Sequence, residues 1–313
     1  MHRAATIRTA CRPAEHGGRA RVPATRAGVA GSVDGVQEPF FRAAPGGDGA
    51  GQQPAADGVL EESFEATEAC VGPWSAQMMH GGPPAALLVR ACERAAGRED
   101  LVALRAAVEF LRPVPVAAVR AGARVVRPGR QVTLVEATLS ADGDDVLRAR
   151  TWLVRRPPGE APPTPDVGAE DDVVPGPADC PPVMSGWDFG YARAMEFRVL
   201  SGDPEGAGDA AVWGRPLVAL VGGEEPSGLQ RAMLVGDSGN GVSAALDWRH
   251  WSFVNIDLDV HLSRPVDGEW LLLDARTRYQ PTGTGLAVSV LRDRRGVVGS
   301  GAQTLVVSPR PLR

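Results

Sequence analysis

The chain has 313 residues, of which 43% are hydrophobic and 23% are charged, and its formal net charge at neutral pH is −5. This composition supports a sizeable core, and the length suits two domains of about 150 residues each. All 33 basic residues are arginine, which excludes a Schiff-base lysine, a pyridoxal anchor and a phosphate-loop lysine. The mildly acidic balance also argues against a nucleic-acid-binding protein, whose binding face should be basic.

The four cysteines are scattered along the chain, at Cys11, Cys70, Cys92 and Cys180. They form no CxxC pair and no His/Cys set at metal-ligand spacing, so the sequence predicts neither a disulfide framework nor a metal site. No apolar run approaches the ~18 residues that a membrane helix needs. We therefore expect a reduced, cytoplasmic protein without a membrane span.

Two segments have compositions that disfavour a packed core. Residues 1–37 are rich in arginine and alanine and are expected to form a disordered tail. Residues 157–184 are rich in proline and acidic side chains and are expected to be a linker. These boundaries leave an N-terminal domain at 38–156 and a C-terminal domain at 185–313.

Each of these halves carries one helical pattern followed by β-rich runs. The helices are expected at 83–96, which opens with prolines suited to a first helical turn, and at 227–236, just after Pro226. The strands are expected at 101–113, 117–127, 130–140 and 146–155, and again at 254–263, 270–279, 285–292 and 297–307.

The two halves are also related in sequence. Arg112-Pro113-Val114 falls on Arg264-Pro265-Val266, and Ala123-Arg124 falls on Ala275-Arg276, both at a spacing of 152 residues. Such a repeat indicates two copies of one structural unit. The predicted fold class is α+β, a double hotdog with two tandem hotdog units, each a long central helix wrapped by an antiparallel β-sheet.

Several short motifs, in this order and spacing, resemble the acyl-CoA thioesterase superfamily, specifically its double-hotdog thioesterase II type. The resemblance runs from about Pro39 to Arg310. The matching stretches are Gly72–Trp74, His80–Leu88, Phe110–Val114, Gly129–Arg130, Gly236–Gly241, Asp257–Pro265 and Gly301–Leu305.

The resemblance implies a catalytic set of an acid, a hydroxyl and an amide that together hold the hydrolytic water. The best matches are Asp257, Thr277 and Gln303, although Leu258 stands where the family often has histidine, and Thr282 and Thr284 are neighbouring candidates for the hydroxyl. A thioester is already electrophilic, so its hydrolysis needs an oriented water, a base and an oxyanion donor, but no metal or cofactor.

Alternation of polar and apolar residues from Asn255 to Leu262 predicts that Asn255, Asp257, Asp259 and His261 share one face of a strand. In the first half, Arg105, Val125 and Arg150 occupy the places of Asp257, Thr277 and Gln303, the last at a spacing of 153. We therefore expect one working site per chain, with the first half keeping structural and binding roles.

Substrate contacts are expected from two further motifs. His80-Gly81-Gly82 precedes a helix N-terminus, where backbone N–H groups favour negative charge and glycines allow close approach. The alternative for this motif is a tight turn with His80 as a capping or core residue. Asp237 and Asn240 follow the second helix, where they line the acyl cavity or simply form a loop.

Taken together, these features predict a cytoplasmic hydrolase that cleaves acyl-CoA to a free acid and CoA. A non-catalytic protein that binds acyl-CoA or an acyl carrier is the alternative, supported by the missing histidine after Asp257. A hotdog hydratase is less favoured because its Asp/His motif is absent. Assembly into a homo-oligomer is left open.

Overall fold

A computed structural model of the chain describes residues 38–44, 59–156, 174–183 and 187–310. The predicted tail at 1–37 and most of the predicted linker lie outside these residues. Within the described residues, no helix is long and apolar enough to cross a membrane.

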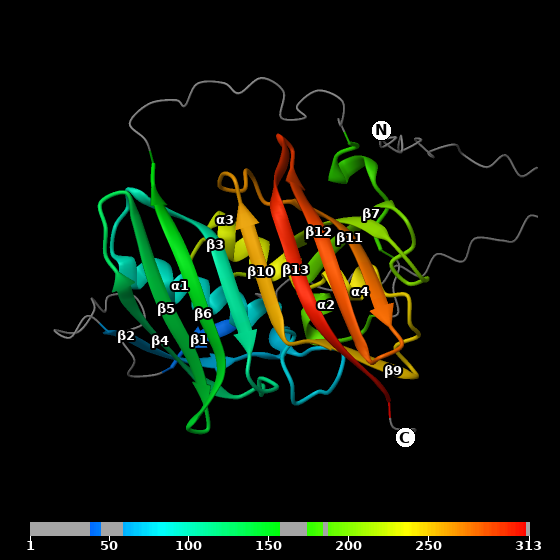
Figure 1. Ribbon diagram of the computed structural model, residues 1–313, viewed down its shortest axis with the longest axis horizontal. Coiled ribbons are helices and arrows are strands. Elements are labelled where there is room, and N and C mark those ends of the chain that lie inside the picture. The colour runs from blue at the N-terminus through cyan, green and yellow to red at the C-terminus, as the bar shows by residue number, and fades with distance from the viewer. Residues whose placement is uncertain (1–37, 45–58, 157–173, 184–186, 311–313) are drawn as a thin grey trace, which may run out of the picture. The chain divides into compact units, whose positions relative to one another are not determined.

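The described part of the chain forms one continuous antiparallel sheet (Figure 1). Its strands follow the order β1-β2-β4-β5-β6-β3-β10-β13-β12-β11-β8-β7, and β9 pairs with β13 off this path. The first half supplies β1 (Phe41–Ala43), β2 (Val59–Ala66), β3 (Leu101–Phe110), β4 (Ala118–Arg127), β5 (Val132–Ala141) and β6 (Asp144–Arg155). The second half supplies β7 (Met195–Ser201), β8 (Ala210–Pro216), β9 (Trp251–Asn255), β10 (Asp257–Leu262), β11 (Leu271–Gln280), β12 (Thr284–Asp293) and β13 (Gly296–Pro309).

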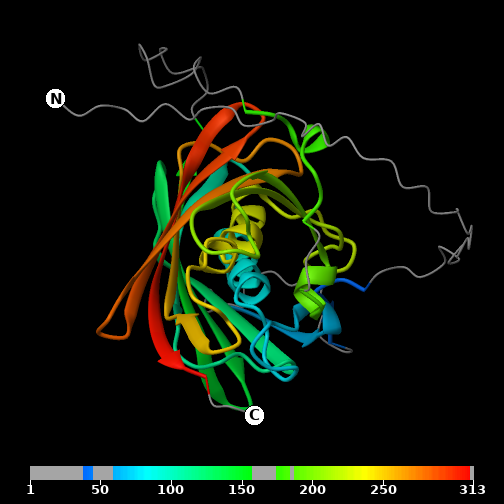
Figure 2. The ribbon, with the colours of Figure 1, turned by 90° about the vertical axis from the view of Figure 1, so that its right-hand side faces the viewer.

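Two helices pack against each other on one face of this sheet, α1 (Gly82–Ala96) and α3 (Gly228–Gly236) (Figure 2). Prolines occupy the first turn of α1, and Gly97 ends the helix in the left-handed conformation at φ 59°. Ser227 caps α3 by accepting a hydrogen bond from the Gln230 backbone N–H. Two single-turn helices, α2 (Gly190–Arg193) and α4 (Gly239–Val242), complete the helical elements that bear on the site.

The core lies between the sheet and these two helices. Leu87, Leu88 and Val89 of α1 are fully buried, as are Met233 and Leu234 of α3. Both predicted helices therefore exist within a residue of their expected bounds. However, α3 has only nine residues, so it is shorter than the long central helix that we expected.

Strands β3 and β10 join the two halves at the middle of the sheet. Ala107 pairs with Asp259, and these residues are themselves 152 positions apart. On either side, Asp257 pairs with Glu109 and His261 pairs with Arg105, which are equivalent pairs under the same spacing. The repeat detected in the sequence therefore corresponds to an approximate twofold axis that passes between Ala107 and Asp259.

The described end of the predicted linker is folded onto the second half. Its short 3-10 helix, Pro177–Asp179, is followed by the buried Cys180. The Trp213 indole Nε1–H donates to the Pro175 carbonyl oxygen at 3.0 Å, and the Val183 N–H donates to the Phe197 carbonyl. Residues 174–183 thus belong structurally to the sheet that follows them.

Candidate active site

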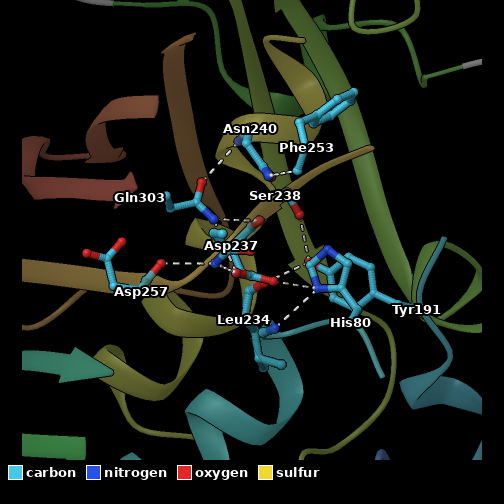
Figure 3. A network of polar contacts seen from close by, with 11 residues as sticks. His80, Tyr191, Leu234, Asp237, Ser238, Asn240, Phe253, Asp257 and Gln303 are labelled. Atoms are coloured by element: carbon cyan, nitrogen blue, oxygen red, sulfur yellow. Dashed lines mark hydrogen bonds and ion pairs between the residues drawn. The ribbon is translucent and has the colours of Figure 1, made fainter. Parts of the chain in front are cut away.

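A buried polar cluster lies where α3 ends against the inner face of the sheet (Figure 3). Its centre is Asp237, the residue that closes α3, which is only 4% exposed. Asp237 Oδ1 accepts hydrogen bonds from Asn255 Nδ2 at 2.9 Å and from Gln303 Nε2 at 3.2 Å. A buried carboxylate needs such donors to remain charged, so the two amides stabilise its ionised form.

Gln303 is fixed at both ends of its amide. It points inward from β13 and is 2% exposed. Its Nε2 donates to the Asp237 carbonyl as well as to the carboxylate, and its Oε1 accepts the backbone N–H of Asn240 at 3.0 Å. The Asn240 side chain donates in turn to the Phe253 carbonyl at 3.1 Å. This satisfied network holds the Gln303 amide in one orientation.

A glycine makes the close packing above Gln303 possible. A Cβ on Gly239 would lie 2.9 Å from Gln303 Oε1 and 2.9 Å from Ser289 Oγ. Any side chain at this position would therefore push α4 away from the sheet and disturb the Gln303 amide.

The other carboxylate oxygen of Asp237 faces the first half of the chain. His80 Nδ1 lies 3.0 Å from Asp237 Oδ2 and 3.2 Å from the Gly82 backbone nitrogen, whose N–H points toward it. The His80 ring stacks on Tyr191 of α2, with centroids 3.6 Å apart and planes within 3°. Burial lowers the pKa of His80, and the Asp237 charge opposes this shift only in part.

Two glycines let the start of α1 approach the end of α3. A Cβ on Gly81 would lie 2.8 Å from Asp237 Oδ2 and 2.7 Å from the Phe110 ring, and one on Gly82 would lie 2.7 Å from the Leu234 carbonyl oxygen. The prolines that follow carry no N–H, and the Gly82 N–H points at the His80 ring. The helix end therefore offers fewer free donors than we expected from its position alone.

The structure does not bring Asp257 to Gln303. Asp257 accepts hydrogen bonds from the Thr304 N–H at 2.5 Å and from Thr304 Oγ1 at 3.0 Å, on the outer face of the sheet. Gln303 immediately precedes Thr304, so its side chain points to the opposite, inner face. The expected meeting of the Asp257 carboxylate with the Gln303 amide is therefore corrected by the alternation of side chains along β13.

Thr277 is buried on β11 but also lies apart from Asp237. Thr277 pairs with Ala287, which pairs with Gln303, so β12 separates the two predicted residues. Its hydroxyl is 2.7 Å from Ser243 Oγ, beside α4. The other candidate hydroxyls, on Thr282 and Thr284, hydrogen-bond to each other in an exposed turn.

Asn255 and Tyr191 belong to this cluster but were not among the predicted site residues. We predicted one strand over 254–263, but β9 ends at Asn255 and β10 begins at Asp257, with Ile256 between them. In β9 the inward residues are Phe253 and Asn255, whereas in β10 Leu258 points inward. This break in alternation turns Asn255 toward Asp237 and leaves Asp257 outside. The polar and apolar residues of the sequence alternate straight through Ile256, so this local pattern predicted an unbroken strand.

Comparison with known proteins gives the family. The model of the acyl-CoA thioesterase N-terminal domain matches residues 71–154, and that of the acyl-CoA thioesterase C-terminal domain matches residues 158–307. The chain therefore belongs to the acyl-CoA thioesterase family. No curated protein sequence matched it.

Solved structures show the fold. A protein assigned as a thioesterase II from Thermobifida fusca YX is 19% identical, covers 85% of this chain and 99% of its own, and has a TM-score of 0.65. A hot dog fold protein of unknown function from Alicyclobacillus acidocaldarius is 17% identical over 80% of this chain and 94% of its own, with the same TM-score. An acyl-CoA thioesterase II from Mycobacterium marinum is 15% identical over 79% and 98%, with a TM-score of 0.56.

Proposed function

We propose that this protein hydrolyses an acyl-CoA thioester to a free acid and CoA, using a water molecule that Asp237 activates directly. The observation that carries the proposal is the convergence of a buried carboxylate with two side-chain amides, Asn255 and Gln303, at the end of α3. The family membership supplies the substrate class.

The cluster supplies a candidate base for this chemistry. A carboxylate can take a proton from water as the water attacks the thioester carbonyl, and the thiolate of CoA then leaves. The amide N–H groups orient the carboxylate: Asn255 Nδ2 donates to Asp237 Oδ1 and to the Asp257 carbonyl, and Gln303 Nε2 donates to Asp237 Oδ1 and to the Asp237 carbonyl. The family resemblance implied a hydroxyl in this set, and here Asn255 provides an amide instead. No metal or other cofactor is part of this proposal.

We also infer that the chain is a double hotdog with one working site. In the sheet, Ala302 on β13 pairs with Asp259 as Arg150 on β6 pairs with Ala107, so Gln303 corresponds to Thr151 and not to Arg150. Counting from the first helical residue, Asp237 corresponds to Ala91, and at a spacing of 152 Asn255 corresponds to Ala103. These first-half residues supply neither a carboxylate nor an amide, so they cannot repeat the chemistry.

The first test compares two carboxylates that differ in their face of the sheet. Asp237→Asn should reduce thiol release from a panel of acyl-CoA esters by about 100-fold or more, since a general base contributes typically 10²–10⁴-fold. Asp257→Asn should retain most of the rate because its carboxylate binds Thr304 on the outer face. If Asp257→Asn is inactive while Asp237→Asn loses no activity, the base must be assigned to Asp257.

The same panel tests the alternatives. Tight binding of acyl-CoA without thiol release would identify a binding protein, and a change in enoyl absorbance would identify a hydratase. Either result would reject the hydrolase. We expect that the protein is cytoplasmic and that it releases thiol from acyl-CoA. A light-scattering measurement will decide whether it is a homo-oligomer.

A further inference from the structure

The Nδ1 atom of His80 has two partners that make opposite demands on it. Asp237 Oδ2, at 3.0 Å, is favourable when Nδ1 carries a proton, and the Gly82 N–H, at 3.2 Å, is favourable when Nδ1 carries a lone pair. A ring nitrogen cannot satisfy both at once. The position of one proton therefore decides which partner His80 serves.

The surroundings of Asp237 favour the proton on Nδ1. Oδ1 already accepts two amide hydrogen bonds, from Asn255 and Gln303, which stabilise a negative carboxylate. A negative Oδ2 facing an unprotonated ring nitrogen would be repelled. Nδ1–H must then donate to Oδ2, and the Gly82 N–H is left without a hydrogen bond to Nδ1.

The ring is held firmly enough to make this contact specific. Tyr191 stacks against it, and the Tyr191 hydroxyl donates to the Leu234 carbonyl at 2.7 Å and lies 2.9 Å from Ser238 Oγ. Both partners belong to the end of α3, beside Asp237. Among the described residues, Asp237 is the charged group in contact with His80, and Tyr191 is the titratable group stacked on its ring.

We propose that His80 is a positioning residue for the Asp237 base, in which a neutral imidazole protonated on Nδ1 donates to Asp237 Oδ2. This inference rests on the proposed function and extends it to a residue of the first half. The hydrogen bond orients the carboxylate and keeps it charged until the water gives up its proton. A second proton, on Nε2, would make the ring an imidazolium and the carboxylate a weaker base. The low pKa of His80 keeps that form from accumulating near neutral pH.

The kinetic test uses variants that separate the ring from its donor. His80→Phe keeps a stacking ring and removes Nδ1–H, so kcat should fall about 10-fold or more while KM changes less than about twofold. The fall of its kcat toward acid should also begin at a higher pH than in the parent chain, because Asp237 without this donor binds a proton more readily. His80→Asn restores an N–H near the same place and should recover part of kcat and of the pH profile. His261→Phe, a histidine exposed on the outer face of β10, is the matched control and should behave like the parent chain.

A second measurement reads the position of the proton directly and does not depend on turnover. Nitrogen-15 NMR of the imidazole, assigned by the loss of one signal in His80→Phe, should show neutral His80 protonated on Nδ1. In Asp237→Ala the proton should move to Nε2, because the Gly82 N–H then becomes the remaining partner of Nδ1.

These results distinguish two failures. Unchanged kcat and pH profile in His80→Phe, with Asp237→Asn inactive, would overturn the role of His80 and leave the hydrolase intact. A lowered kcat that His80→Asn does not recover, with an unshifted pH profile, would also overturn it in favour of a packing role. An Nε2–H tautomer in the parent chain would contradict the proposed contact directly. Full activity of Asp237→Asn would instead reject the proposed function.

Discussion

Asp237 and Asp257 are twenty positions apart, and their surroundings give them different chemical capacities. Asp237 is enclosed by two amides and an imidazole at the junction of two helices, whereas Asp257 is bound by a backbone N–H and a hydroxyl on the outside of the sheet. Of these two carboxylates, Asp237 is the one shielded from bulk water, which suits the base that we propose. The residue type was thus less informative than the face on which it lies.

His80 should also make folding stability depend on pH. Its pKa is lowered by burial in the folded protein, whereas in the unfolded chain it is near 6.5. Below that pH the unfolded chain binds a proton that the folded chain refuses, so the free energy of unfolding falls as pH decreases, by at most about 1.4 kcal/mol per pH unit. Urea unfolding at a series of pH values should show this slope in the parent chain and a smaller one in His80→Phe. Equal slopes would show that His80 titrates normally.

Cys92 should be chemically inert in the folded chain. It is fully buried in α1, and burial raises the pKa of its thiol to about 12. In a Cys11→Ser background, which removes the cysteine outside the described residues, a thiol reagent should label Cys92 only after unfolding. Mass spectrometry of the labelled peptides checks this expectation, and rapid native labelling would contradict the burial.

At the scale of elements, the repeated Arg-Pro motif has different consequences in the two halves. Arg264 forms a paired hydrogen bond with the fully buried Asp293 at the end of β12, and Asp293 also accepts backbone N–H groups from Asp267 and Arg295. In the first half, Arg112 lies 3.7 Å from Asp144, and both side chains are more than half exposed. The Arg-Pro motif therefore fixes a turn through a buried ion pair in the second half, whereas in the first half its arginine forms only an exposed ion pair.

Arg264→Ala should destabilise the protein by about 2–3 kcal/mol, since it leaves the buried Asp293 charge without its main partner. Arg112→Ala is the matched control, and it should cause no measurable loss because exposed ion pairs contribute little. Chemical denaturation of the two variants measures the difference. Equal losses would mean that the Arg-Pro turn, and not the ion pair, carries the stability.

For the molecule as a whole, the shared sheet couples the two halves. At the seam, Ala106 and Val108 of β3 and Leu258 and Val260 of β10 are all fully buried. Packing of α1 against α3 adds a second contact between the halves. Neither half can unfold without exposing this apolar surface, so the two should lose structure together.

Leu258→Ala tests this coupling. Removing a fully buried leucine side chain typically costs about 2–5 kcal/mol, and here the loss should lower one common transition. Tryptophan fluorescence and far-UV circular dichroism, followed with the same denaturant series, should coincide in the parent chain and in the variant. Two separate transitions would show that the halves fold independently.

The sequence by itself determined the repeat, both helices and most strand positions, because these depend on periodicity, capping and residue spacing that are local to the chain. The family resemblance also pointed to Gln303 on the last strand, and this residue lies in the buried cluster. The tertiary structure alone decided which acid meets that amide. A break of one residue at Ile256 reversed the facing of every later side chain in β10, and the end of α3 brought Asp237 across to β13. The period-two alternation of polar and apolar residues does not reveal such a break. Contacts between elements far apart in sequence are set by packing, which no local pattern encodes.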